Sequence, residues 1–316
     1  QTTEAHNAIA EVIDEVAKET GREYIFISRS DSTLRGHYPL ETELLKVNYE
    51  KNTGKTIDGE ILCPFFKEGG RFTVDNVHYV KYGEELIPAN ETEFAKDKTF
   101  GYTAATMPEY VEEKTKGEYK ASDVTCISLE EIHDMDIDGI QKKLMEVRDF
   151  NKIIVNAVDY ADVKVFCVAL YRAMAAGKVF MFRTAAAIVK VMGGVTDQPL
   201  LIREKMIVNE TENGGIIVVG SHTDKTTRQV EELKKLTDVE FIELDATLVK
   251  DDAAFEAEVQ RCLDREEACI RAGKTVCCYT TRALITADTG DKEDELRLSV
   301  KISDAVQSLV GRLKIT

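Results

Sequence analysis

The chain has 316 residues, of which 43% are hydrophobic and 31% charged, as is typical of a soluble globular protein of about two domains. Its formal net charge of −16 argues against general nucleic-acid binding, which needs a basic face. No apolar run approaches the ~20 residues that span a bilayer. The acidic N-terminal segment does not resemble a signal peptide, so we expect a cytoplasmic protein without a membrane partner.

The first part of the chain alternates apolar strands with helical segments. An apolar stripe predicts a helix over 5–20 that ends at Gly21; its members are Ala8, Ile9, Val12, Ile13 and Val16. The other predictions here are strands over 24–28, 59–64, 71–74, 77–80, 123–128, 152–156 and 179–182, and helices from 39, over 129–150, over 161–176 and from 184. Asp75-Asn76 predicts a hairpin between the third and fourth of these strands, and the polar stretch 84–106 predicts an irregular excursion.

The second part repeats this alternation after a connector. Predicted strands cover 216–221, 241–244 and 275–279, and predicted helices cover 225–236, 252–272 and 299–313. We therefore expect an α/β protein of two domains, each a largely parallel sheet flanked by helices, with the ligand cleft between them. The expected bounds are 1–200 and 215–316, joined by a connector at 201–214.

Cysteine and histidine spacing predicts neither disulfides nor a metal site. The seven cysteines are scattered and odd in number, with no CxxC pair, so we expect free thiols in a reducing cytoplasm. The five histidines show no HExxH or HxH spacing.

Ligands of parallel sheets bind at the carboxyl ends of the strands, and the loop over 28–37 lies at such an end. Its two arginines, Arg29 and Arg35, could fork onto a carboxylate, while Asp31 and its hydroxyl neighbours could bind ligand hydroxyls. Gly36 would let the backbone approach the ligand. The alternative interpretation is a polar loop whose side chains cap the next helix.

Three further loops have comparable alternatives. Arg71, after Gly69-Gly70, is either a second anion contact or a solvated arginine at a hairpin entry. Arg183-Thr184 follows a strand, where a ligand would lie, and Thr184 would also serve as a helix N-cap. Gly220-Ser221 lies between a strand and a helix N-terminus, which predicts an anion site or a capped turn, without a Walker A or GxGxxG pattern.

The segment SRSDSTLRGHYPLE resembles the substrate loop of the four-carbon acid sugar kinase family. The resemblance continues in the same order through CPFFKEGGRFTVDNVHYV, ANETEFAKD, FMFRTAAA and VVGSHTDKTTRQ. It implies an N-terminal domain that binds threonate, erythronate, 3-oxo-tetronate or a relative, and a C-terminal domain that binds ATP. The implied reaction transfers the γ-phosphoryl group to a terminal hydroxyl, with Mg²⁺ bridging the phosphates.

The resemblance also implies roles for individual residues. The implied sugar-acid contacts are Asp31, Ser32, Thr33, Leu34, Arg35 and Gly36, with Arg71 as a second anion contact. Gly220 and Ser221 are the implied nucleotide contacts, and Asp31 is the candidate catalytic group that orients or deprotonates the accepting hydroxyl.

The chain departs from the family pattern at both ends. The D-D-x-T-G opening and the Gly-Gly-x-Thr and Lys-x-Gly-x-Phe-Gly segments of the family do not occur in it, so we expect a chain trimmed at both ends. The alternatives are a non-catalytic sugar-acid-binding protein or inactive core fragment and, less well supported without GxGxxG, a dinucleotide-dependent oxidoreductase. Expected partners are a sugar acid and ATP, and self-association stays open.

Overall fold

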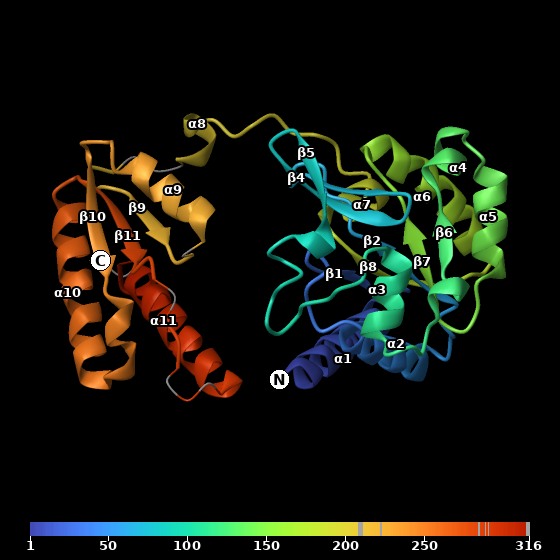
Figure 1. Cartoon of the computed structure of the whole chain (residues 1–316), viewed down its shortest axis with the longest axis horizontal. Coiled ribbons are helices and arrows are strands. Elements are labelled where there is room, and N and C mark those ends of the chain that lie inside the picture. The colour runs from blue at the N-terminus through green and yellow to red at the C-terminus, as the bar shows by residue number, and fades with distance from the viewer. Residues whose placement is uncertain (208–210, 222, 284, 288, 290, 314–316) are drawn as a thin grey trace. The chain divides into compact units, whose positions relative to one another are not determined.

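A computed structural model describes residues 1–207, 211–221, 223–283, 285–287, 289 and 291–313. The chain forms two compact units, Gln1–Gln198 and Pro199–Thr316, and the predicted connector falls within the second of them (Figure 1). The predicted cleft between the domains stays a prediction.

The first unit is built on a five-stranded parallel sheet. Its order is β1 (Ile27–Arg29), β8 (Phe180–Thr184), β2 (Gly59–Cys63), β7 (Asn151–Val155) and β6 (Thr125–Ile127). Every neighbouring pair in this sheet is parallel. The carboxyl ends of the strands therefore meet at one edge, where the loops after β1, β2 and β8 lie close together.

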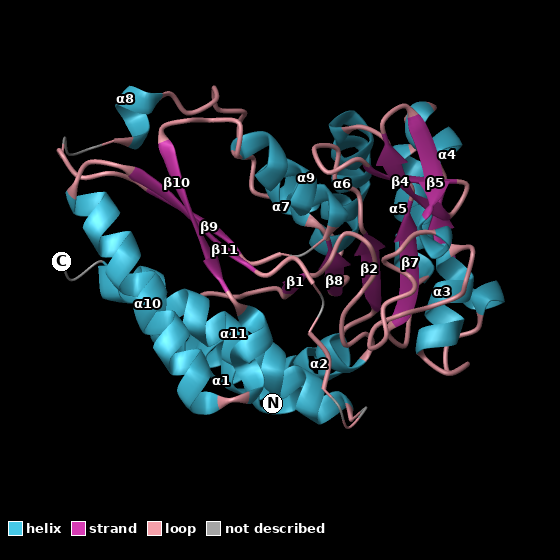
Figure 2. Cartoon of the chain, turned by 60° about the vertical axis from the view of Figure 1, so that its left-hand side comes forward, coloured by secondary structure: helices cyan, strands magenta, loops and turns pink. Residues whose placement is uncertain are grey.

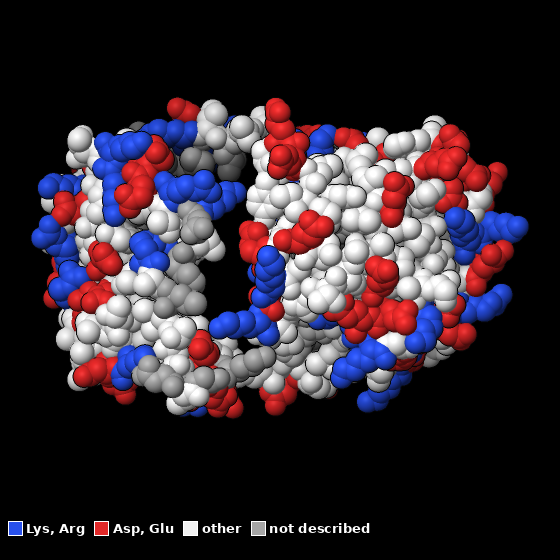
Figure 3. All heavy atoms as spheres, in the orientation of Figure 1, with Lys and Arg blue, Asp and Glu red and all other residues white. Residues whose placement is uncertain are grey.

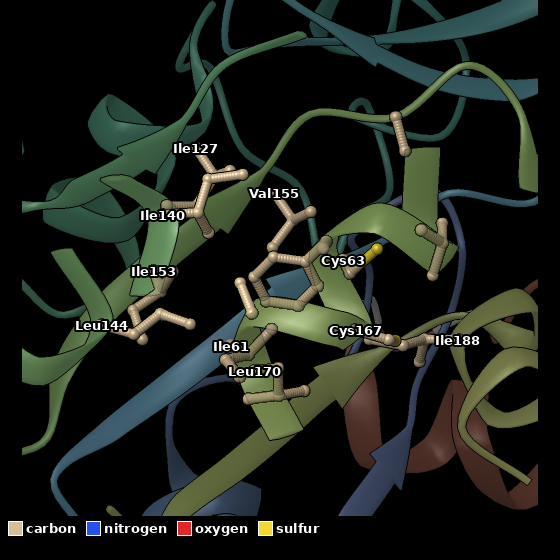
Figure 4. Close-up of a cluster of buried hydrophobic side chains, with 14 of the residues drawn as sticks. Ile61, Cys63, Ile127, Ile140, Leu144, Ile153, Val155, Cys167, Leu170 and Ile188 are labelled. Carbon is tan, nitrogen blue, oxygen red and sulfur yellow. The ribbon is translucent and has the colours of Figure 1, made fainter. Parts of the chain in front are cut away.

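Both faces of this sheet are buried. Successive side chains of a strand point to opposite faces, so neighbouring residues of one strand enter different core clusters. Ile61 and Cys63 of β2 belong to a core cluster that Figure 4 shows, packed against α4 (Leu129–His133), α5 (Ile137–Glu146), α6 (Tyr160–Ala175) and α7 (Ala186–Met192). Leu62 faces a second cluster with α3 (Met107–Lys114). A third cluster joins Met181 to α1 (Thr2–Thr20) and α2 (Leu40–Thr53).

A small antiparallel sheet follows β2. The predicted hairpin is confirmed: β3 (Arg71–Val74) pairs with β4 (Val77–Tyr82) across a turn in which Asp75 and Asn76 have φ of 49° and 63°. The stretch predicted to be irregular contains a third strand, β5 (Glu85–Pro88), so that prediction was wrong in part. Its final residue is a proline at an edge strand, which the local pattern does not identify as strand.

Two helix predictions also differ from the structure. The predicted helix over 129–150 is two helices, because Met135 has φ of 53° and the Asp136 side chain caps α5 by accepting from the amide of Gly139. In α1 the predicted stripe is only partly directed at the core. Ile13 packs against the third cluster, but Ile9, Val12 and Val16 are 49%, 57% and 51% exposed.

The second unit has a three-stranded parallel sheet in the order β10 (Val239–Leu244), β11 (Thr275–Thr280) and β9 (Ile216–Val219). Its helices are α8 (Arg203–Met206), α9 (Asp224–Leu233), α10 (Asp252–Arg271) and α11 (Lys292–Leu313), seen as cyan ribbons in Figure 2. The main core of this unit lies between β10, β11, α10 and α11.

The predicted α/β class, with largely parallel sheets flanked by helices, is confirmed in both units. The seven cysteines are unpaired, as predicted. Within the described part of the chain, no helix combines the length and apolarity that a membrane crossing requires.

Candidate functional site

The loop after β1, residues 30–37 and called here the sugar loop, is organised around the carboxylate of Asp31. Its Oδ2 accepts hydrogen bonds from the Thr33 hydroxyl, from Arg35 Nε at 2.9 Å and from the Arg35 amide at 3.3 Å. Burial by itself would raise the pKa of Asp31. The hydrogen bonds from Arg35 and Thr33 outweigh it and hold that pKa below its usual value. Asp31 is therefore an ionised acceptor inside the loop.

Four consecutive carbonyls of the sugar loop, those of residues 32–35, accept hydrogen bonds from side chains that are distant in sequence. The pairs are His78 Nε2 to Ser32 at 2.7 Å, Tyr102 hydroxyl to Thr33 at 3.0 Å, Tyr110 hydroxyl to Leu34 at 2.8 Å and Arg183 to Arg35 at 3.2 Å. Two amides of the loop donate to Asp31: that of Leu34 to its carbonyl at 3.2 Å and that of Arg35 to its Oδ2 at 3.3 Å. The loop is thus held by distant donors on its carbonyls and by Asp31 on its amides.

The backbone of the sugar loop adopts conformations that few residues accept. Leu34 has φ of 70° and Gly36 has φ of 131°, and the latter value strains any residue with a Cβ atom. The side chain of Leu34 is 2% exposed and packs in the core beside Tyr38. Any contact of Leu34 with a ligand would therefore run through its main chain.

Acidic side chains are spread over the visible face of both units, so an anionic ligand needs a local group of cations (Figure 3). Arg71, the first residue of β3, provides one beside the sugar loop. The guanidinium carbons of Arg71 and Arg35 lie 5.3 Å and 5.1 Å from the centre of the same ring, that of Phe94. The structure thus brings together two arginines that lie 36 positions apart in the sequence.

The Arg71 side chain is only partly satisfied. Its NH1 group donates to the carbonyl of Gly69 at 2.5 Å, but its buried Nε has no hydrogen-bond partner in the described residues. No described carboxylate forms an ion pair with it. Burial lowers the pKa of Arg71, and the more distant carboxylates of Asp31 and Glu93 offset this only in part. Arg35 differs, because it pairs with Asp31 at 2.9 Å and with Asp97 at 3.9 Å. A half-buried cation without a counter-ion is the feature expected of an anion site.

Arg183 supports the sugar loop from beneath. It is 3% exposed, pairs with Glu41 at 3.1 Å and lies 4.8 Å from the ring centre of Tyr38. The interpretation of Thr184 as an N-cap was wrong. Thr184 ends β8, and the N-cap of α7 is Ala185 without a side-chain hydrogen bond.

A buried ion pair continues this support into the sheet. Lys152 and Glu60, both fully buried, lie 2.7 Å apart on β7 and β2, and the Tyr38 hydroxyl donates to Glu60 at 3.5 Å. The ring of Tyr38 stacks on that of Tyr110 with centres 5.7 Å apart. Breaking a buried ion pair leaves an uncompensated charge, so the Lys152–Glu60 pair resists rearrangement. Through the hydrogen bond from Tyr38 to Glu60, it helps to hold Tyr38, the residue directly after the sugar loop.

In the second unit the predicted nucleotide residues follow β9. Thr280 Oγ1 donates to the carbonyl of Gly220 at 3.2 Å, and Arg282 donates to that of Ser221. The Ser221 hydroxyl lies 3.2 Å and 3.3 Å from those of Thr223 and Thr226, at the start of α9. Helix N-termini present free amides to phosphate groups. His222, in the same sequence segment, lies outside the described residues.

Several residues at the first site carry no role in the sequence analysis: Glu41, His78, Phe94, Asp97, Tyr102 and Tyr110. A signal existed for four of them, because the family-like segments contain Glu41, His78, Phe94 and Asp97. Among the described residues, no group of three or more His, Cys, Asp or Glu side chains could hold a metal ion.

Two family models match the chain. A sugar-binding N-terminal domain covers residues 1–192, and a nucleotide-binding C-terminal domain covers residues 216–315. The chain therefore belongs to the family of proteins that join these two domains. This combination fits the four-carbon acid sugar kinase family.

Solved structures show a similar fold. The "putative tRNA synthase" of Salmonella typhimurium LT2 has a TM-score of 0.57 and 12% identity, over 93% of this chain and 64% of that one. Haemophilus influenzae protein HI1011, of family DUF1537, has a TM-score of 0.49 and 16% identity, over 94% of this chain and 66% of that one. A DUF1537 domain from Bordetella bronchiseptica was solved as a domain-swapped dimer with bound citrate. It has a TM-score of 0.41 and 17% identity, over 98% of this chain and 65% of that one. The chain thus spans about two thirds of the length of these structures. Among curated proteins, none matches it.

Proposed function

We propose that the protein is an ATP-dependent kinase of four-carbon acid sugars. In this proposal the first unit binds the sugar acid and the second unit binds ATP, whose γ-phosphoryl group is transferred to a terminal hydroxyl. The observation that carries it is the half-buried Arg71 guanidinium, which forms no ion pair among the described residues, has an unpartnered Nε and shares the Phe94 ring with Arg35 beside the sugar loop. The sugar-binding and nucleotide-binding domain matches support it.

The residues of the sugar loop would divide the work. Arg71 and Arg35 would bind the carboxylate, since guanidinium groups form paired hydrogen bonds with it. Asp31 accepts its three hydrogen bonds on Oδ2, so Oδ1 would accept from the terminal hydroxyl and orient it. Ser32 and the main chain of Leu34 and Gly36 would complete the contacts. Thr33 is 1% exposed and would act through its hydrogen bond to Asp31. A low pKa makes Asp31 a weak base, which favours orientation over proton removal.

In the second unit, Gly220 and Ser221 would contact the nucleotide phosphates at the start of α9. Mg²⁺ bound with ATP would neutralise charge on the phosphates during transfer. A cytoplasmic setting, where ATP is available, stays a prediction.

The test is ADP release by the whole chain, measured with a panel of tetronates, together with calorimetric titration of threonate, erythronate and ATP. Turnover with one tetronate is the expected result. Binding of a sugar acid without turnover would favour the alternative of a non-catalytic binding protein. No binding of any tetronate would contradict both.

Arg71→Met sharpens this test. Loss of a charge-assisted contact should weaken tetronate binding by about 30-fold and leave ATP binding unchanged. Arg71 is a cleaner target than Arg35, because Arg35 Nε also holds Asp31 and Thr33 in place. Arg172→Met is the matched control, since Arg172 is an exposed partner of Asp138 in the same unit. Equal effects of the two substitutions would contradict the assignment.

A further inference from the structure

The stretch 89–102, first expected to be an excursion from the sheet, forms a wall beside the sugar loop. Phe94 contributes its ring to both arginines, and Asp97 pairs with Arg35 at 3.9 Å. Further along, the ring of Phe100 lies 4.8 Å from that of His37, and the Tyr102 hydroxyl donates to the carbonyl of Thr33 at 3.0 Å. This wall therefore contacts the loop at several points.

The position of Phe94 within the wall is fixed by a compact turn. The Asp97 amide donates to the Phe94 carbonyl at 3.4 Å, and the Tyr102 amide donates to the Ala95 carbonyl at 3.1 Å. The turn closes at Gly101, where a Cβ atom would lie 2.5 Å from the Asp97 carbonyl oxygen. Ala95 and Tyr102 are both buried, so the turn is anchored on either side of the ring.

Two guanidinium groups near one ring repel each other, and this repulsion contributes to the lowered pKa of Arg71. Arg35 has two carboxylate partners, Asp31 and Asp97, whereas Arg71 forms no ion pair among the described residues and is attracted to Asp31 only at longer range. The negative face of an aromatic ring attracts a cation, more strongly when the cation is partly desolvated. Arg35 is also held by its ion pairs with Asp31 and Asp97, and Arg71 by its hydrogen bond to the Gly69 carbonyl. Phe94 adds a short-range attraction that both guanidinium groups share while no anion is bound. A leucine of similar bulk would fill the space but supply none of it.

We infer that Phe94 is a positioning residue that holds Arg35 and Arg71 as one carboxylate clamp, through which the site distinguishes a sugar acid from an uncharged sugar alcohol. The inference rests on the proposed function. It adds that the ring, which need not touch the ligand, determines acid selectivity by keeping the two arginines together.

The experiment compares Phe94→Leu, Phe94→Tyr and Phe100→Leu in the whole chain by calorimetric titration with threonate, erythronate and ATP. Phe94→Leu should weaken acid binding by about tenfold, because both cation–π contacts are lost. Phe94→Tyr keeps an aromatic face and should bind the acid like wild type. Phe100→Leu, in the same turn but against His37, should also bind like wild type. ATP affinity should stay constant throughout.

The outcomes separate the two proposals. If wild type binds no tetronate, the proposed function fails. If wild type binds but Phe94→Leu retains full affinity, or Phe94→Tyr loses as much as Phe94→Leu, the inference about Phe94 is overturned alone. A parallel loss of acid and ATP affinity in Phe94→Leu, with a lowered melting temperature, would also overturn it, because that pattern indicates a general packing defect.

Discussion

Two loops of this molecule occupy the same position in two parallel sheets but are supported differently. The sugar loop follows the edge strand β1, and the loop of Gly220 and Ser221 follows the edge strand β9. In the first, four consecutive carbonyls are bound by side chains from β4, the 89–102 wall, α3 and β8. In the second, the two carbonyls are bound by Thr280 and Arg282, near neighbours at the end of β11.

The difference teaches how a loop becomes pre-organised. Its own sequence gives hydroxyls, carboxylates and glycines, but long-range donors decide whether the backbone is held in one conformation before a ligand arrives. A loop that is already ordered loses less conformational entropy on binding. We therefore expect the sugar loop to be the more rigid of the two, and three perturbations test this comparison.

The largest expected effect comes from protonation of His78. Burial lowers the pKa of His78 to about 4, and its neutral ring donates to Ser32 while accepting from Thr73. Because the folded-state pKa lies below the ordinary value of 6.5, His78 contributes stability above pH 6.5 that is lost as the pH falls toward 4. The loss amounts to about 3 kcal/mol.

Urea unfolding at several pH values measures this loss, and His78→Gln should flatten the slope between pH 6.5 and 4. Hydrogen exchange should show that acid opens residues 30–37 before residues 216–221. Equal slopes in wild type and His78→Gln would show that the stability loss comes from other groups.

A smaller effect is expected when one donor is removed from each loop. Tyr110→Phe leaves the buried carbonyl of Leu34 without its partner, which should cost about 2 kcal/mol. Thr280→Val removes the donor to the exposed Gly220, where water can replace it, and should cost about 0.5 kcal/mol. Denaturant midpoints measure both. A larger loss in Thr280→Val would reverse the comparison.

The smallest effect distinguishes the glycines of the two loops. Gly36 has φ of 131°, so Gly36→Ala should cost about 1 kcal/mol and weaken tetronate binding. Nothing lies within 4 Å of a Cβ atom added at Gly220, so Gly220→Ala should leave the free energy of unfolding unchanged. Melting temperatures of the two variants would show the difference, and identical values would count against a strained sugar loop.

Much of the fold was predictable because it depends on local patterns. Apolar runs, helical spacing and Asp75-Asn76 identified most strands and the hairpin. The family-like order of segments identified the sugar loop and Arg71. The errors fall where a distant partner decides. β5 is a strand because it pairs with β4, and three residues of the α1 stripe, Ile9, Val12 and Val16, are exposed although their spacing is that of a buried face.

By itself, the sequence determined the two α/β units and the polar loop at the end of β1, because periodicity and composition act over neighbouring residues. Only the tertiary structure decided what that loop can do. It turned the Leu34 side chain into the core, bound four carbonyls from behind and placed Arg35 and Arg71 at one phenylalanine ring. Such contacts join residues far apart in the chain, and no local pattern contains the distance between them.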